Sequence, residues 1–482
     1  MKRSLITLSA VAALATTSFA TIDIDKKFMK LEKKIKKLEK KIKKSNKKLN
    51  IVKAHDAGDN IKWDVNFRTA VDSIEYTHAN GTKSKNGGLL TNKLVLGMKF
   101  KADPTTTFYG SLVNYKVFGD TANHSQANTK PGYADFDWLT SSNPTGNSLK
   151  VREAYFLYAN DSFMNNQDIS WTASIGRRPS MDGLGINFRE GEDRKSALAH
   201  IINVEVDAAS FRWNLGKVTP MEGSWFKLCW GRGLSNATPR FTQAGTDYAN
   251  DTTKQGDIDM LGFIFVPYND GQYSVHTQWS TAHNMIGFTN TEINKIMSGS
   301  AGTFQDVGDL TLMTAMFKAD GIGEDINDYL NDTTFFASYA QSKTDPTATA
   351  SEGGMLGSAN SETGHSSWIG VQAPCVMSDD ARIGLEWNKG SKYWRSVTYA
   401  EDTIVGSKIA ARGTAIEAYW LKPLTRSLSM SIRHTQIKYD YTGSNGFFGA
   451  DGTPMTMAQA QAAGQNPVEK ATDTRVAISY KF

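Results

Sequence analysis

The densest group of residues that could act on a solute is a mixed-charge segment, residues 177–199. Charges of both signs that face each other across a narrow passage create a strong transverse field, which orders water and selects solutes by charge and dipole. Gly183 and Gly185 would permit the tight backbone that an inward fold needs. The alternative is a solvent-exposed surface loop. The charged residues are Arg177, Arg178, Asp182, Arg189, Glu190, Glu192, Asp193, Arg194 and Lys195.

Catalytic and metal-binding motifs are absent from the sequence. It contains no His-Glu-x-x-His, no Gly-x-Ser-x-Gly, no phosphate loop and no dinucleotide fingerprint. The separation of His276 and His283 suits no common metal site. The acidic run from Asp325 to Asp332 lacks the glycine and the closing Glu of a calcium loop. We therefore expect neither an enzyme nor a cofactor.

Alternating strands would position the charged residues. From Ile61 to Asp72, apolar and polar side chains alternate strictly, which predicts a strand with one apolar and one polar face. Similar strands recur to the end of the chain. Their polar faces carry full charges and their apolar faces carry aromatic residues, a distribution typical of lipid outside and water inside. The wall positions expected to face the lumen are Asp64, Arg68, Arg382, Glu386, Arg433 and Arg475.

The connections between these strands alternate between short and long. Seven short connections and eight long ones, among them residues 77–91, 177–199 and 389–407, predict an all-β protein. The fold would be a transmembrane antiparallel β-barrel of about sixteen strands, with both termini at the short-turn end. Residues 177–199 would form its third long loop.

The start of the chain has the pattern of a secretory signal peptide. Lys2 and Arg3 precede an apolar run, Leu5–Ala15, and a small-residue cleavage site that ends at Ala20. We expect residues 1–20 to be a signal peptide, residues 21–53 a coiled coil and residues 54–482 the barrel.

Residues 21–53 have a heptad pattern. Apolar residues recur with 3-4 spacing, which predicts a helix that buries its stripe against another copy. The pattern leaves two and three strands open. The oligomerisation positions are Phe28, Leu31, Ile35, Leu38, Ile42 and Leu49.

The predicted coiled coil is strongly basic. Residues 21–53 carry a net charge of +10. Since the whole chain carries +5 and residues 1–20 contribute +2, residues 54–482 carry −7. This asymmetry indicates either attraction to a periplasmic polyanion such as peptidoglycan or a solvated face that keeps the helix soluble. We expect no nucleic-acid partner in that compartment.

The last strand ends on Tyr480 and Phe482, and this ending resembles the C-terminal assembly signal of Gram-negative outer-membrane proteins. With the signal peptide, the loop rhythm and the segments Ile175–Ser180 and Asn187–Gly191, the chain resembles a trimeric general-diffusion porin with an added coiled coil. More closely, it is similar to an outer-membrane family catalogued as a domain of unknown function. The resemblance implies a homotrimer in outer-membrane lipid and a third loop folded into the lumen.

Two functions follow from these features. The first is a passive channel for small hydrophilic solutes or ions, narrowed by the third loop. The alternative is a structural protein that tethers the outer membrane to peptidoglycan through the basic coiled coil, or a surface adhesin.

Overall fold

A computed structural model describes most of the chain, and two units are described separately, residues 1–60 and 61–482. The described residues are 34–36, 38–39, 41–42, 61–119, 141–144, 146–178, 180–192, 196, 198–234, 257–300, 302, 304–323, 326–347, 355–444 and 453–482. In the first unit, residues 34–36, 38–39 and 41–42 are helical, with Ile35, Leu38 and Ile42 exposed. Phe28, Leu31, Leu49 and the predicted signal peptide lie outside the described residues.

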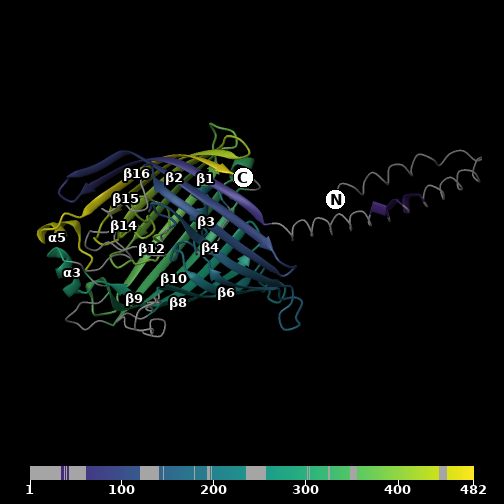
Figure 1. Ribbon diagram of the computed structural model, residues 1–482, viewed down its shortest axis with the longest axis horizontal. Helices are drawn as coiled ribbons and strands as arrows, with labels where there is room; N and C mark the ends of the chain where they lie inside the picture. Colours follow the sequence, from purple (N-terminus) through teal and green to yellow (C-terminus); the bar gives the residue numbers. More distant parts are fainter. Residues whose placement is uncertain are drawn as a thin grey trace, which may run out of the picture. The chain divides into compact units, whose positions relative to one another are not determined.

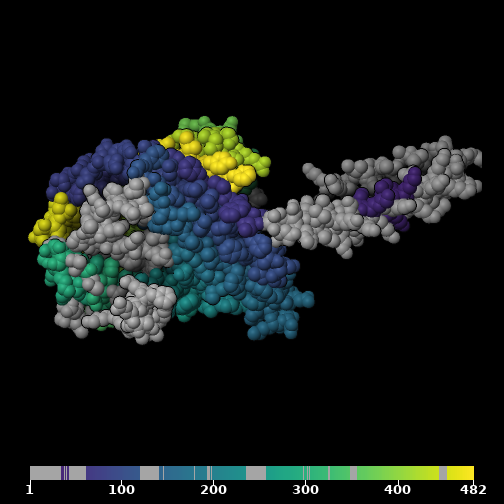
Figure 2. All heavy atoms as spheres, viewed as in Figure 1, coloured from purple at the N-terminus to yellow at the C-terminus, as the bar shows by residue number. Residues whose placement is uncertain are grey.

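The second unit is a closed antiparallel barrel of sixteen strands, as the sequence predicts (Figure 1). Each strand pairs with its neighbours in sequence, and β1 pairs with β16 to close the ring. Figure 2 shows the last strand, in yellow, beside the first, in purple. The strands are β1 (Lys62–His78), β2 (Lys83–Lys101), β3 (Thr106–Val117), β4 (Gly146–Asn160), β5 (Trp171–Arg177), β6 (Asp207–Asn214), β7 (Trp225–Leu234), β8 (Ile258–Asn269), β9 (Tyr273–Gly287), β10 (Gln305–Asp320), β11 (Thr334–Pro346), β12 (Thr363–Pro374), β13 (Arg382–Gly390), β14 (Gly413–Pro423), β15 (Leu428–Tyr439) and β16 (Val468–Lys481).

The outer face of the barrel is apolar and aromatic. Along β1, Trp63 exposes 56% of its surface, whereas Asp72 on the inner face is fully buried. On β6–β9 outward rings form a row in which neighbouring ring centroids are 5.6 to 6.3 Å apart. The rings belong to Phe211, Trp213, Phe226, Phe263 and Trp279.

Within the described residues of the barrel unit, short helices occur only in the connections between strands. They are α2 (Ile186–Glu190), α3 (Asn290–Met297), α4 (Asp328–Asn331), α5 (Met457–Ala462) and the 3-10 turn η1 (Met355–Gly357). Figure 1 shows α3 and α5 at one end of the barrel and the C-terminus at the other. Among the described residues, no helix has the length and apolar character needed to cross a membrane.

The first predicted long loop is wrong. Residues 77–91 belong mostly to β1 and β2, which a four-residue turn, 79–82, connects. The predicted loop contains Gly87, Gly88 and several polar residues, which we interpreted as a connection. The ladder continues through them because Ile74 pairs with Asn86 and Tyr76 with Ser84.

The inner face is not uniformly polar, which corrects a second expectation. The inner residues of β1, β2 and β13–β16, here called the charged half, include Arg68, Asp72, Lys93, Glu386, Glu417, Arg433 and Arg475. The inner residues of β8–β11, here called the apolar half, include Ile258, Met260, Leu310, Leu312 and Ala340. These apolar side chains are buried because segments of the chain pack against them from inside the barrel.

Candidate functional site

Two loops fold into the barrel and pack against each other. The third loop, residues 178–206, follows β5, and the seventh loop, residues 391–412, follows β13. The main-chain nitrogen of Asn203 donates to the oxygen of Val397 at 2.7 Å, and the nitrogen of Val397 donates to the oxygen of Ile201 at 2.9 Å. Backbone groups so far from water need such partners, so the two loops satisfy each other.

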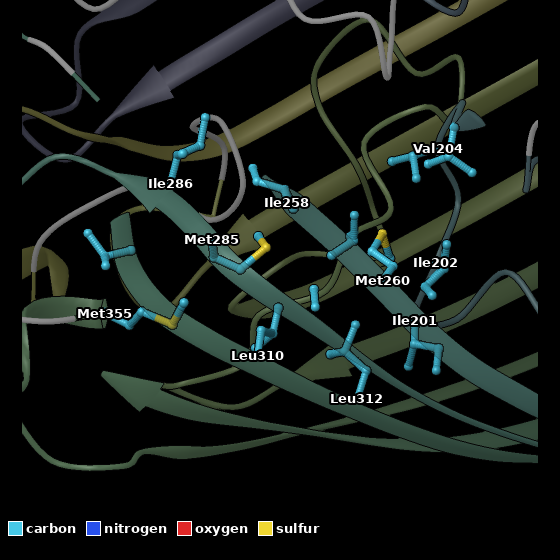
Figure 3. Packing of buried hydrophobic residues seen from close by; sticks show 14 of the residues in the cluster. Ile201, Ile202, Val204, Ile258, Met260, Met285, Ile286, Leu310, Leu312 and Met355 are labelled. Carbon is cyan, nitrogen blue, oxygen red and sulfur yellow. The ribbon is translucent and has the colours of Figure 1, made fainter. Parts of the chain in front are cut away.

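The apolar half holds both loops. Ile201, Ile202 and Val204 of the third loop and Trp394 and Val397 of the seventh share one buried cluster with the inner residues of β8–β11. Figure 3 shows Ile201 and Ile202 beside Met260 and Leu312. Burial of each such side chain stabilises the docked loops by roughly 1.5–3 kcal/mol.

Gly185 allows the third loop to approach the wall closely. Its φ is +104°, and a Cβ there would lie 2.2 Å from the ring of Trp368. Only glycine tolerates this position without strain. The following helix, α2, has one turn and ends at Gly191 with φ +62°. This short helix carries Arg189 toward the charged half.

Arg189 is the centre of a buried ion cluster. Its Nη1 donates to the two carboxylate oxygens of Glu417 at 3.2 and 3.1 Å and to Thr403 Oγ1 at 3.2 Å. Its Nη2 donates to the main-chain oxygen of Glu401. Burial alone would lower the pKa of Arg189, but Glu417 and Glu401 outweigh burial and raise the pKa. Arg189 therefore stays cationic inside the barrel.

Lys408 of the seventh loop extends this cluster along the wall. Its Nζ lies 2.7 Å from Glu386 Oε2 and also contacts Glu417 Oε1. Glu386 Oε2 accepts a hydrogen bond from Trp368 Nε1 at 2.9 Å. Thr435 Oγ1 donates to Glu417 Oε2 at 2.6 Å. Two loops and four strands thus share one network of alternating charge.

Asp402, at the tip of the seventh loop, forms a second cluster. Its carboxylate lies 2.9 Å from Arg68 Nη1, 2.9 Å from Lys93 Nζ and 3.2 Å from Arg475 Nη1. Tyr115 Oη donates to it at 3.0 Å. Burial alone would raise the pKa of Asp402, but Arg68, Lys93 and Arg475 together hold the pKa well below its usual range.

A cavity of about 850 Å³ opens beside these two clusters. Its wall includes both loops and the turn between β14 and β15, and also the C-terminal Phe482. This turn and this terminus belong to the short-turn end of the barrel. The charged residues on its wall include Arg68, Lys93, Arg152, Asp182, Arg189, Glu190, Glu192, Asp402, Arg433 and Arg475.

The structure distributes the other predicted third-loop residues around this cavity and along its edge. Asp182 Oδ2 is 2.6 Å from Arg152 Nη2, Glu190 Oε1 is 3.4 Å from Arg433 Nη1, and Glu192 Oε1 is 2.8 Å from Lys481 Nζ. Farther from the cavity, Arg177 Nη2 lies 3.0 Å from Glu205 Oε2, and Arg178 Nη1 donates to Ser174 and Ser210. Asp193, Arg194 and Lys195 lie outside the described residues.

The predicted wall residues separate into three groups. Arg68, Arg433 and Arg475 surround the tip of the seventh loop, and Glu386 contacts Lys408. Asp64 lines the cavity but is exposed. Arg382 is exposed at the short-turn rim, where it donates to the main-chain oxygen of Asp332 at 3.0 Å. Arg382 is therefore not part of either cluster.

Sequence reasoning missed the seventh loop. Glu401, Asp402 and Lys408 carry much of the charge in the two clusters, yet we interpreted residues 389–407 only as a long connection. A signal was present, because the seventh loop, residues 391–412, contains Trp394 and Ile409, which are fully buried. Large apolar residues in a loop that is rich in charge indicate that the loop packs against something.

Metal binding finds no support in the part of the chain that the structure describes. No group of three or more His, Cys, Asp or Glu residues there could hold a metal ion. Cys229 on β7 and Cys375 after β12 are free thiols.

Comparisons with known proteins come from a family match and from solved structures. Residues 83–482 match the family described as "Protein of unknown function (DUF3373)". No curated protein matches the sequence.

Several solved outer-membrane proteins are similar to this chain in outline. OprB of Pseudomonas putida is 10% identical with a TM-score of 0.48, and 89% of this chain and 96% of that chain are covered. An anion-selective porin from Comamonas acidovorans is 11% identical with a TM-score of 0.46, and 88% of this chain and 99% of that chain are covered. OmpF of Salmonella typhi, in complex with daunomycin, is 11% identical with a TM-score of 0.45, and 87% of this chain and 98% of that chain are covered. The barrel assignment rests on the strand order of this chain itself.

Proposed function

We propose a function for this protein, which belongs to the DUF3373 family, from the geometry of its own barrel. The protein is an outer-membrane channel through which small hydrophilic solutes or ions diffuse passively. The third and seventh loops narrow the channel. The observation that carries the proposal is the charged network of Arg189, Glu417 and Asp402 beside a cavity with charged residues on its wall, inside a closed barrel.

The outer face supports a location in a membrane. Trp63, Phe156 and Tyr339 are exposed on strands whose opposite faces carry buried side chains, and outward rings lie side by side from β6 to β9. Exposed apolar faces on this scale would be unfavourable in water and are typical of a barrel in lipid. Lipid of the outer membrane is therefore the proposed surrounding.

The size of the barrel supports a passage. Sixteen strands enclose a lumen wider than the wall side chains alone can fill. The inserted loops occupy part of this space, and the cavity of about 850 Å³ is a further part. The volume suits hydrated ions and small polar molecules.

Single-channel conductance of the refolded protein in a planar bilayer tests the proposal. We expect discrete current steps, and we expect the ratio of anion to cation permeability to fall when Arg189→Gln and Arg433→Gln are combined, because both cations line the cavity. Lys83→Gln with Lys389→Gln is the matched control, since it removes two cations with exposed side chains. A correctly folded barrel without any conductance would contradict the channel function.

Self-association is a second part of the proposal. The exposed side chains of Ile35, Leu38 and Ile42 form an apolar stripe on a helix. Association of several copies would bury this stripe and stabilise the assembly. We propose a homotrimer with the coiled coil in the periplasm. Ile35→Asn with Ile42→Asn should lower the mass of the detergent-solubilised assembly, measured by light scattering. An unchanged mass would contradict this role of the helix.

Contact between the basic coiled coil and peptidoglycan is the remaining proposal. The fourteen lysines of residues 21–53 would supply the attraction. Purified peptidoglycan should retain the protein and should release it when Lys33, Lys37, Lys40 and Lys44 are changed to Glu. Equal retention of both forms would indicate that the lysines only keep the helix soluble.

A further inference from the structure

The Asp402 cluster has the composition of a carboxylate-binding site. The Arg68 guanidinium, the Lys93 ammonium, the Arg475 guanidinium and the Tyr115 hydroxyl all donate to one carboxylate. They come from β1, β2, β16 and β3, so the rigid wall of the barrel fixes their positions. Charge-assisted hydrogen bonds from arginine are the strongest that proteins use for carboxylates.

The cations of this cluster depend on Asp402 for their charge balance. Within the described ranges, Arg68 and Lys93 have no other carboxylate partner. Arg475 has a second partner, Asp72, whose Oδ1 lies 2.6 Å from Arg475 Nε. Arg68 Nε is buried without a hydrogen-bond partner among those residues. Without Asp402, the wall would keep three cations opposite one anion.

Asp402 reaches the cluster from a loop tip with an unfavourable backbone. Its φ is +54°, a left-handed conformation that residues other than glycine rarely adopt. Such a conformation costs of order 1–3 kcal/mol and persists only where its surroundings hold it. Arg433 Nη2 and Arg475 Nη1 hold it by donating to the main-chain oxygen of Asp402 at 2.9 and 3.1 Å. The wall supplies the binding groups, and the loop supplies an anion that another carboxylate could replace.

The cavity gives a solute access to these groups. Arg68, Lys93, Asp402, Arg433 and Arg475 all line it. Its volume of about 850 Å³ exceeds the volume of a small organic acid several times. A solute carboxylate in the cavity can therefore approach Arg68, Lys93 and Arg475, the three cations that Asp402 now contacts.

We propose that Arg68, Lys93, Arg475 and Tyr115 form a binding site for the carboxylate group of a small organic anion, and that Asp402 is an internal competitor for this site. The inference rests on the proposed channel function, which it refines to anionic solutes. A solute carboxylate would displace the Asp402 side chain, and the side chain would return when the solute leaves.

Binding and conductance measured on the same full-length protein test this proposal. The probe is succinate, titrated calorimetrically against the refolded protein, with inorganic phosphate in a parallel titration. Asp402→Asn should lower the succinate Kd about tenfold, because the competing charge is gone. Arg68→Gln with Lys93→Gln should abolish binding. Asp440→Asn is the matched control, since its carboxylate pairs with the half-exposed Lys389.

The outcomes separate the site from the channel. Equal succinate affinity in the wild type and in Asp402→Asn, with folding verified by heat-dependent gel migration, would overturn the proposal. Phosphate binding that equals succinate binding in both forms would also overturn the carboxylate assignment. Current steps without succinate binding would leave the channel in place and reject the site. Succinate binding that responds to Asp402→Asn without any current would keep the site and reject the channel.

Discussion

The charged half and the apolar half of the barrel interior hold the same two loops by different forces. Met260, Leu310 and Leu312 pack against the third loop, and these contacts have no preferred direction. Arg68 and Arg475 instead form directional ion pairs with Asp402 of the seventh loop, and Glu417 forms one with Arg189 of the third loop. The apolar half can therefore hold the loops in place without affecting which solutes pass. The charged half can affect both the position of the loops and the selection of solutes.

The two halves also differ in what they contribute to stability. Apolar burial stabilises the docked loops directly, at about 25 cal/mol per Å². Buried ion pairs lose most of their attraction to desolvation, so they add little net stability, yet removing one partner is costly. An apolar lining would hold the loops at least as well, which favours the proposed role of the charged network in binding or selecting solutes.

Removing Arg189 should give the largest effect, because it breaks the charged half at its centre. Arg189→Met leaves Glu417 and Glu401 without their guanidinium partner and should lower the free energy of unfolding by about 3–5 kcal/mol. Ion preference should change as well. Urea unfolding in lipid vesicles, followed by tryptophan fluorescence, measures the first effect, and bilayer conductance measures the second. A stable variant with unchanged selectivity would contradict the role of the cluster.

Shortening Ile201 tests the apolar half. Ile201 is fully buried in the cluster of both loops and β8–β11. Ile201→Ala should cost about 2–5 kcal/mol in unfolding free energy through the cavity that it leaves. The same conductance assay should find the ion preference unchanged. A shift in ion preference comparable to that of Arg189→Met would show that the two halves do not differ in function.

Gly185 lies between Trp368 of β12 and the helix that carries Arg189 to the charged half. Gly185→Ala places a methyl group 2.2 Å from the Trp368 ring at a positive φ. We expect a loss of about 2–4 kcal/mol from overlap and backbone strain together. Gly464→Ala is the matched control, because Gly464 has φ +76° and open space around it. Its loss should be about 1 kcal/mol, from strain alone. Equal losses in unfolding free energy would contradict the close packing of the third loop.

As the pH falls, the contacts of the apolar half should lose stability at a higher pH than the contacts of the charged half. His200 of the third loop lies between two serines, with Nδ1 2.7 Å from Ser338 Oγ and Nε2 3.0 Å from Ser366 Oγ. Burial lowers the pKa of His200 to about 3. The unfolded chain binds this proton below about pH 6.5. Stability should therefore fall as the pH falls from about 6.5 toward 3, by up to about 1.4 kcal/mol per pH unit.

The pKa of Asp402 is lowered as well, but its contribution to stability is lost at a lower pH than that of His200. Its pKa is lowered by its cations, so its contribution is complete above about pH 4 and is lost only at lower pH. His200→Gln, which keeps a polar side chain between the two serines, should remove the acid sensitivity between pH 4 and 6. Unfolding curves across this range check the expectation, and an unchanged pH dependence in His200→Gln would contradict it.

The periodicity of the chain was sufficient to predict the barrel but not its contents. Alternation in segments such as Ile61–Asp72 requires a strand with an apolar outer face, and fifteen connections require sixteen strands. The inner apolar half was harder to predict, because β10 has apolar residues on both faces. Leu310 and Leu312 face inward while Met313 and Phe317 face outward. Such a strand indicates packing on both sides.

The partners of individual charges could not be predicted from sequence. Arg189 and Glu417 are 228 residues apart, and only the closed barrel with both loops docked brings them together. The contact between Asp402 and Arg68 spans 334 residues. Alternation places a side chain on a face, but it does not say which loop reaches that face. For this reason the sequence predicted the wall cations near Asp402 and missed Asp402 itself.

The pairing of β1 with β16 completes the Asp402 cluster as well as the barrel. The main-chain nitrogen of Phe482 donates to Val65, and the nitrogen of Val65 donates to Phe482. Arg475 near the end of the chain contacts Asp72 near the beginning of the barrel, and Arg475 also contacts Asp402. Until β16 pairs with β1, the group of cations around Asp402 lacks Arg475. The Asp402 cluster is therefore a product of ring closure, because no part of the barrel short of the closed ring contains all of its members.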